Sequence, residues 1–168
     1  MKYLLDTNIC IYIINEKPNK VLRKFEQYPV HDFGISSITH AELQYGVEKS
    51  KNKNTNQDAI NEFLLPLTIL PFYGEKLVAC YGEIRSLLES KGETIGPLDI
   101  MIAAHALSLN LTIISNNIKE FSRVSNLKCE SWIQKKEGSF LGLKGVQCQR
   151  ADPVSPPCWQ NLLILKKF

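Results

Sequence analysis

The chain has 168 residues and a formal net charge of +3, a length that suits one globular domain with a substantial core rather than two domains. The charge is uneven, because residues 1–134 contain 14 basic and 15 acidic residues whereas residues 135–168 contain 6 and 2. A near-neutral body excludes recognition of nucleic acid by bulk charge, so such a partner would have to be bound at a local site.

Short apolar runs alternate with helical patterns in the first half of the chain. Runs of β-branched and aromatic residues predict buried strands, and apolar side chains that recur every three or four residues predict amphipathic helices. Asp6 or Thr7 is placed to cap the first helix. In chain order, the predicted elements are a strand at residues 3–5, helices at 9–14 and 19–27, a strand at 33–36, a helix at 39–47, a polar loop at 49–56, a helix ending near 65 and a strand at 68–70.

The same alternation continues in the second half. A long helix is expected over residues 73–91, where the apolar side chains form one stripe. Pro97 suits the first turn of a helix over residues 98–109, which is apolar almost all round and should lie centrally. A buried strand at residues 111–114 and a short helix that contains Glu120 follow. This order predicts an α/β fold in which a mostly parallel sheet carries helices on both faces.

Residues 135–168 differ in kind from the rest of the chain. They mix Gly, Pro and Cys without a sustained apolar period until residues 162–165, and they carry all of the excess positive charge. This composition predicts an atypical, poorly ordered C-terminal extension rather than a second domain. The folded domain is therefore expected to span residues 1–134.

The cysteines and the N-terminus indicate the compartment. The five cysteines are widely separated, and none of their spacings resembles a zinc site. An odd, scattered set is typical of free thiols in a reducing environment. Asp6, Thr7 and Asn8 interrupt the N-terminal apolar run, and no stretch reaches membrane-spanning length. These observations predict a cytoplasmic protein without a membrane partner.

Four acidic residues stand where the ends of predicted elements should meet at one edge of the sheet. Asp6 directly follows the first strand, and Glu42 lies one turn into the helix after the second strand. Asp99 lies in the first turn of the central helix, and Glu120 follows the last predicted strand after a short turn. Ligands of parallel sheets bind beyond the carboxyl ends of the strands, so the pattern points to a shared site.

Each acid also has a purely structural interpretation. Asp6 is a suitable helix cap, and Thr39 with Glu42 has the spacing of a capping box. Asp99 suits a helix N-terminus, and Glu120 is a candidate for a solvated surface acid. The joint pattern favours a site, because two carboxylates about 4–5 Å apart repel by roughly 3–4 kcal/mol and a cluster of them needs a counter-charge. Oxygen ligands suit Mg²⁺ or Mn²⁺, ions that assist phosphodiester hydrolysis.

Four motifs carry a resemblance to a known family: LLDTNI at the N-terminus, SSITHAEL, IGPLDIMIAAHAL and TIISNNIKEF. In this order they resemble the PIN-domain ribonucleases, specifically the VapC toxins of bacterial type II toxin–antitoxin pairs, over about residues 1–133. The resemblance implies a three-layer α/β/α fold and an Mg²⁺- or Mn²⁺-dependent endoribonuclease. The residues that it implies are Asp6, Glu42, Asp99 and Glu120 as catalytic residues, the first three of them also as metal ligands, and Thr7, Asn8 and Asn116 in support.

The resemblance also implies partners. These are an RNA substrate, with tRNA as the expected class, a VapB-like antitoxin, a second copy of the chain, and promoter DNA reached only through the antitoxin. Lys119 and Arg123, near the fourth acid, are candidates for contacts to RNA phosphates. His105 should face away from Asp99 on the same helix, so a core or surface histidine is expected rather than a ligand.

Two other functions remain open at this point. One is a catalytically silent PIN-fold binding partner in an antitoxin–DNA complex, in which the acids serve as helix caps. The other is a PIN nuclease that acts on DNA or in RNA processing. Nucleotide-cofactor enzymes and serine hydrolases lose support, because the sequence contains no Gly-x-Gly-x-x-Gly, P-loop or Gly-x-Ser-x-Gly motif.

Overall fold

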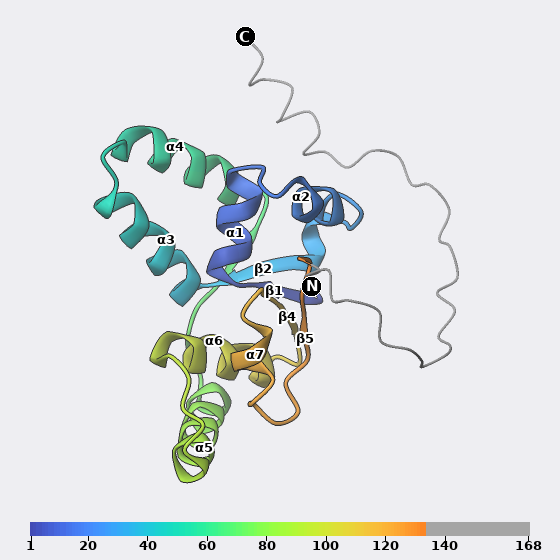
Figure 1. Ribbon diagram of the computed structural model, residues 1–168, viewed down its shortest axis with the longest axis vertical. Helices are drawn as coiled ribbons and strands as arrows, with labels where there is room; N and C mark the ends of the chain where they lie inside the picture. Colours follow the sequence, from blue (N-terminus) through green and yellow to red (C-terminus); the bar gives the residue numbers. More distant parts are fainter. Residues whose placement is uncertain (134–168) are drawn as a thin grey trace. The chain divides into compact units, whose positions relative to one another are not determined.

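A parallel sheet of five short strands, in the order β3-β2-β1-β4-β5, runs through the centre of the described residues (Figure 1). The computed structural model describes residues 1–133, so the predicted extension over residues 135–168 lies outside the described residues. Each neighbouring pair of strands is parallel. The strands are β1 (Tyr3–Leu5), β2 (Phe33–Ser36), β3 (Thr68–Leu70), β4 (Thr112–Ile114) and β5 (Cys129–Glu130).

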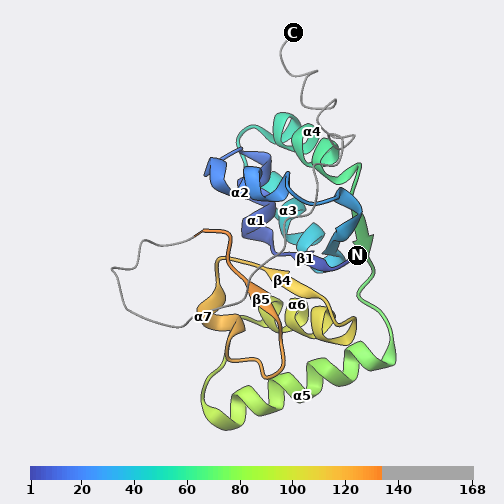
Figure 2. The same cartoon turned by 90° about the vertical axis from the view of Figure 1, so that its right-hand side faces the viewer.

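Helices cover both faces of this sheet and give the fold three layers, as Figures 1 and 2 show. One layer contains α1 (Thr7–Ile14), α2 (Asn19–Phe25), α3 (Ser37–Lys49) and α4 (Lys53–Leu64), with a single 3₁₀ turn at Val30–Asp32. The other contains α5 (Glu75–Lys91), α6 (Pro97–Ser108) and α7 (Ile118–Phe121). The predicted α/β architecture, with a parallel sheet between two helical layers, is confirmed.

The core lies on both faces of the sheet, because successive strand side chains point to opposite sides. Leu5 packs with Ile35 in the cluster beneath α1 to α4, whereas its neighbour Leu4 packs with Ile113 in the cluster beneath α5 to α7. Most residues of α6 are buried. The prediction of a central helix there is therefore confirmed.

One prediction of local structure is wrong, and one strand was not predicted. The polar loop expected at residues 49–56 ends early, because α4 begins at Lys53. The first turn of α4 is exposed and polar, so no apolar periodicity marks it until Ile60. The strand β5 was not predicted, since two residues are too short to form a pattern. Within residues 1–133, no helix is both long and apolar enough to cross a membrane.

Candidate functional site

Asp6 stands at the carboxyl end of β1, where it caps α1 and receives hydrogen bonds on both carboxylate oxygens. Its Oδ1 accepts from the backbone N–H of Thr7 at 2.8 Å, and its Oδ2 accepts from the hydroxyl of Ser115 at 2.6 Å. The side chain is buried, with 3% of its surface exposed. Burial raises the pKa of Asp6, the two hydrogen bonds oppose that shift, and the charges of Glu42 and Glu120 add to it. Asp6 is thus both a helix cap and a constrained carboxylate.

Glu42 projects from α3 towards the start of α1. The hydroxyl of Thr7 donates a short hydrogen bond to Glu42 Oε2. The capping-box interpretation of Glu42 is wrong, because Ser36 is the N-cap of α3 and accepts from the Ile38 N–H at 3.1 Å. Glu42 lies one turn further along the helix, and its carboxylate bonds Thr7 instead of the helix end.

Asp99 and Glu120 form a pair of hydrogen-bonded carboxyl groups. Burial, the bond to Glu120 and the charge of Asp6 raise the pKa of Asp99 to about 7. The pKa of Glu120 is lowered, since it accepts from Asp99 and from Asn117. The pKa values of the two groups are therefore shifted in opposite directions, upward for Asp99 and downward for Glu120. Carboxyl pairs whose pKa values are shifted apart in this way are common at active sites.

The backbone around Asp99 leaves little room beside its carboxylate. Pro97 occupies the first turn of α6, as expected. A Cβ atom added to Gly96 would lie 3.1 Å from Asp99 Oδ2. On the other side, Asn117 Nδ2 lies 3.4 Å from the same oxygen. Glycine at position 96 thus allows the chain to approach the carboxylate closely.

The charges of three other acids act on Asp99. Asp6, Glu120 and Glu42, which come from different elements of the fold, each raise the pKa of Asp99. These electrostatic effects agree with the inferred convergence, and the assignment of the four acids to one site stays a prediction.

The donor atoms fit a hard divalent cation by their chemistry. Within residues 1–133, no three Asp, Glu, His or Cys side chains are already arranged to hold a metal ion together. Two of the acids have hydrogen-bond partners in the structure instead. Glu42 accepts from the hydroxyl of Thr7, and Asp99 is bonded to Glu120. Carboxylate oxygens without sulfur or imidazole suit Mg²⁺ or Mn²⁺. Because a metal ligand must be ionised, the raised pKa of Asp99 would make the binding of such an ion pH-dependent.

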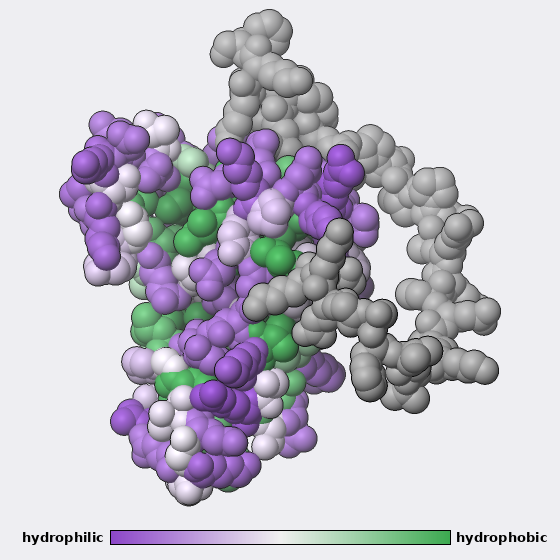
Figure 3. Space-filling view, in the orientation of Figure 1, coloured by the Kyte–Doolittle hydropathy of each residue, from purple (hydrophilic) through white to green (hydrophobic). Residues whose placement is uncertain are grey.

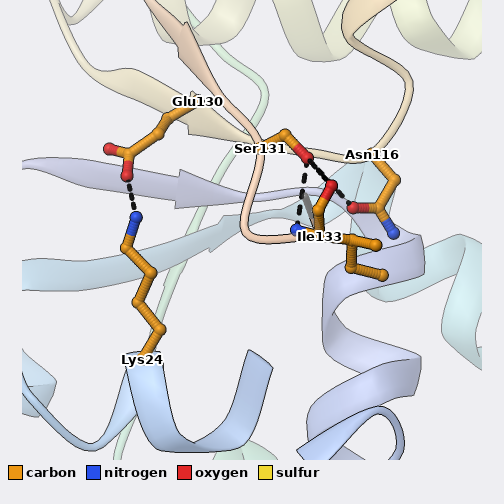
Figure 4. Close-up of polar contacts among 5 residues, drawn as sticks. All are labelled: Lys24, Asn116, Glu130, Ser131 and Ile133. Carbon is orange, nitrogen blue, oxygen red and sulfur yellow. Dashed lines mark hydrogen bonds and ion pairs between the residues drawn. The ribbon is translucent and has the colours of Figure 1, made fainter. Parts of the chain in front are cut away.

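Two residues that contact the acids were not predicted, and the described partner of one predicted supporting residue is not an acid. Ser115 and Asn117 contact Asp6 and Asp99. The predicted supporting amide of Asn116 instead accepts from the hydroxyl of Ser131 at 3.5 Å, as Figure 4 shows. Asn8 is exposed in the first turn of α1. Ser115 follows a buried strand directly, as Asp6 does, and that shared position was the signal available in the sequence.

The strand β5 fastens the turn that carries Ser115. The N–H of Ser115 donates to the carbonyl of Glu130 at 3.1 Å. The side chain of Glu130 in turn forms an ion pair with Lys24 of α2 (Figure 4). Ser131, the next residue, bonds both Asn116 and the carbonyl of Ile133. The end of the described chain therefore holds the turn after β4 in place.

The two basic residues predicted to contact RNA have different surroundings. Lys119 is exposed on α7. Arg123 donates through Nη1 to the carbonyl of Thr94 at 3.0 Å, and its charge contributes to the low pKa of Glu120. A role for either in RNA binding stays a prediction.

An apolar groove of about 360 Å³ lies between α1, α3 and α4. Hydrophobic residues are visible between α4 and α1 in the view of Figure 3. The groove includes Glu42 in its lining, so it reaches the acidic site. Its apolar lining residues are Ile11, Ile14, Leu43, Val47, Ala59 and Ile60.

Comparison with known proteins agrees with this geometry. The model of the PIN domain family matches residues 3–127. Ribonuclease VapC2 of Rickettsia felis is 48% identical over 133 residues, covering 79% of this chain and 98% of that protein. The tRNA(fMet)-specific endonuclease VapC of Shigella flexneri is 41% identical over 132 residues, again covering 79% of this chain and 98% of that protein.

Among solved structures, this chain is similar to the crystal structure of VapBC2 from Rickettsia felis bound to a DNA fragment from their promoter. The TM-score is 0.71 at 46% sequence identity, covering 79% of this chain and 100% of that chain. The matched family model covers most of the chain, and the relatives match it over nearly their whole length. The chain belongs to the PIN domain family and, within it, to the VapC-type ribonucleases.

Proposed function

We propose that the protein is an Mg²⁺- or Mn²⁺-dependent endoribonuclease and the toxin of a type II toxin–antitoxin pair. The observation that carries the proposal is that the charges of Asp6, Glu42 and Glu120 all act on Asp99, whose pKa is raised to about 7. A cluster of carboxylates at this position needs a counter-charge, and a divalent cation would supply it. The names of the relatives, ribonuclease and tRNA-specific endonuclease, support RNA as the substrate.

The residues have separate roles in this proposal. Asp6, Asp99 and Glu42 would hold the cation, which supplies an activated water and stabilises charge on the phosphate oxygens. Ser115 and Thr7 keep two of these carboxylates oriented through their hydroxyl groups. Glu120 is the hydrogen-bond partner of Asp99 and would complete the acidic cluster beside the cation. Asn8 and Asn116 remain proposed supporting residues.

The proposed substrate is a tRNA, and Lys119 is a proposed contact to its backbone. Its ammonium is exposed next to Glu120 in the sequence, and phosphate contacts of this kind position a nucleic acid without reading its sequence. The Shigella flexneri relative is named for its action on tRNA(fMet).

The proposed protein partner is a VapB-like antitoxin. The groove between α1, α3 and α4 is apolar and ends at Glu42, so an amphipathic segment seated there would also obstruct the acidic site. The Rickettsia felis complex is described as bound to promoter DNA, and we expect this chain to reach such DNA only through its antitoxin. A homodimer is also proposed, with analytical ultracentrifugation as its test.

Cleavage assays with the purified full chain test the proposal. Labelled tRNA, a linear RNA and single-stranded DNA are incubated with Mg²⁺, with Mn²⁺ or with EDTA. The expected result is metal-dependent RNA cleavage that Asp6→Asn and Asp99→Asn each abolish. Glu83→Gln, on the exposed side of α5, is the control and should cleave normally.

Each alternative predicts a different outcome of the same assay. No cleavage by the wild-type protein in either metal would favour the catalytically silent binding partner. Preferential cleavage of DNA would favour the other PIN nuclease. Full activity of the Asp6→Asn variant would reject the assignment of the metal site.

A further inference from the structure

A buried histidine joins the two helices that carry Glu42 and Asp99. His105 lies on α6, two turns after Asp99, and only 2% of its surface is exposed. Its Nδ1 lies 2.9 Å from the hydroxyl oxygen of Ser36. Ser36 is the N-cap of α3, the helix that carries Glu42. A single side chain–side chain hydrogen bond therefore connects α6 to the first turn of α3.

The hydrogen-bond requirements of Ser36 determine the protonation of His105. Ser36 Oγ accepts from the N–H of Ile38 at 3.1 Å, and Ser36 has no exposed surface. Its hydroxyl proton needs an acceptor, since an unpaired buried polar group is costly. The acceptor that the described residues provide is His105 Nδ1. With Ser36 as the donor, His105 is a neutral imidazole that accepts at Nδ1 and carries its proton on Nε2.

A second contact holds the same corner of the fold. The ring of Phe72 lies edge-on to the His105 ring, with centroids 5.7 Å apart and an angle of 88°. The backbone N–H of Phe72 donates to the hydroxyl of Ser37 at 3.0 Å. The start of α3 is therefore fixed from two sides, by α6 and by the segment after β3.

We propose that His105 is a positioning residue for the acidic site: through Ser36 it fixes the start of α3, and hence Glu42, relative to α6 and Asp99. This inference rests on the proposed nuclease function. Apolar packing alone tolerates small displacements of one helix against another, whereas a buried hydrogen bond is directional. Metal sites are sensitive to such displacements, because groups that orient ligands typically contribute about 10- to 100-fold to metal affinity.

Two substitutions separate positioning from simple core packing. His105→Leu fills the space but removes the acceptor, whereas His105→Asn places an amide oxygen close to the position of Nδ1. Ile102→Ala is the matched control, because Ile102 is fully buried on the same helix and its aliphatic side chain makes no hydrogen bond, so its loss destabilises the core and leaves the bond between His105 and Ser36 in place. All variants are made in the full chain, and their melting temperatures are recorded first.

The first readout needs no metal. Amide hydrogen exchange at the first two turns of α3 should be about tenfold faster in His105→Leu than in Ile102→Ala at matched stability. His105→Asn should restore slow exchange. Nitrogen-15 spectra of the wild-type protein should show an unprotonated Nδ1 and a protonated Nε2 on His105.

The second readout is Mn²⁺ affinity, measured by electron paramagnetic resonance without RNA. His105→Leu should weaken binding about tenfold, with His105→Asn close to the wild type and Ile102→Ala within about twofold of it. Equal exchange rates and equal affinities in His105→Leu and Ile102→Ala would overturn the inference. Failure of the wild-type protein to bind Mn²⁺ would refute the proposed function, and the exchange data would still decide the role of His105.

Discussion

The hydroxyl of Ser115 donates a hydrogen bond of 2.6 Å to Asp6 Oδ2, although 109 residues separate the two in the chain. The same hydroxyl accepts from the backbone N–H of Asn117 at 2.9 Å. Asn117 in turn contacts Asp99. One buried serine therefore ties the carboxylate after β1 to the turn after β4 and, through that turn, to α6.

Replacing Ser115 by alanine should impair catalysis more than folding. The bond from Ser115 lowers the pKa of Asp6 against the effect of burial, so its loss raises that pKa further. We expect kcat/KM for RNA to fall about tenfold at pH 7, in line with hydrogen bonds to charged groups. The acid limb of the pH–rate profile, measured between pH 6 and 9, should move to higher pH.

Ser122→Ala provides the matched control for that substitution. The hydroxyl of Ser122 donates to the carbonyl of Lys119 on an exposed surface. This variant should retain the wild-type profile. Identical profiles for Ser115→Ala and the wild type would show that Ser115 does not support Asp6.

Asp99→Asn should make the metal-free protein more stable at alkaline pH. The pKa of Asp99 is about 7 in the folded protein, against an ordinary value of 3.8. A carboxyl whose pKa is raised by folding stabilises the folded state below its unfolded pKa, and this contribution is lost as the pH rises through the folded pKa. The asparagine variant carries no charge to repel Asp6 and Glu120.

The gain is measurable by thermal or urea unfolding in EDTA. At pH 8 the variant should exceed the wild type by about 1–2 kcal/mol, a figure reduced for partial exposure of the carboxyl. The difference should shrink towards pH 5, where the wild-type Asp99 is protonated. A difference that does not change with pH would mean that Asp99 is not the perturbed group.

Filling the groove should block the antitoxin without affecting catalysis. Gly46 lines the groove on α3, and no atom lies within 4 Å of a Cβ added there. Gly46→Phe should weaken binding of the cognate VapB-like antitoxin at least about 100-fold, as expected for a side chain at the centre of an interface. Gly82→Phe on α5 is the matched control, since a Cβ added to Gly82 would also meet nothing within 4 Å.

Calorimetric titration measures the binding of the antitoxin, and an RNA cleavage assay measures catalysis. Gly46→Phe should cleave RNA as the wild type does and resist neutralisation by the antitoxin. Antitoxin binding that is equal in both glycine variants would place the interface elsewhere.

The sequence was sufficient for four of the five strands and for the layers, because each depends on local pattern. A strand of three apolar residues followed by Asp6 needs no knowledge of the rest of the fold. The partners of the acids depend instead on tertiary packing. Of the adjacent amides, Asn117 contacts Asp99 and Asn116 contacts Ser131, and no local pattern distinguishes them. The role of Ser36 as the cap of α3 was hidden by the capping-box spacing of Thr39 and Glu42.

Removal of residues 136–168 should leave the nuclease intact. The relatives match this chain over about 133 residues and nearly their whole length, and the four acids lie before that point. The truncated protein should keep the melting temperature and RNA cleavage rate of the full chain within experimental error. A large loss of either would show that the C-terminal residues contribute to the folded domain.

The central claim is that the acidic cluster binds a divalent cation, and Mn²⁺ binding to the EDTA-treated full chain tests it most directly. The wild-type protein should show saturable binding by electron paramagnetic resonance at pH 8, weaker at pH 6 because Asp99 must lose its proton. Asp6→Asn and Asp99→Asn should each remove this binding while remaining folded. Undiminished Mn²⁺ binding in both variants would contradict the account.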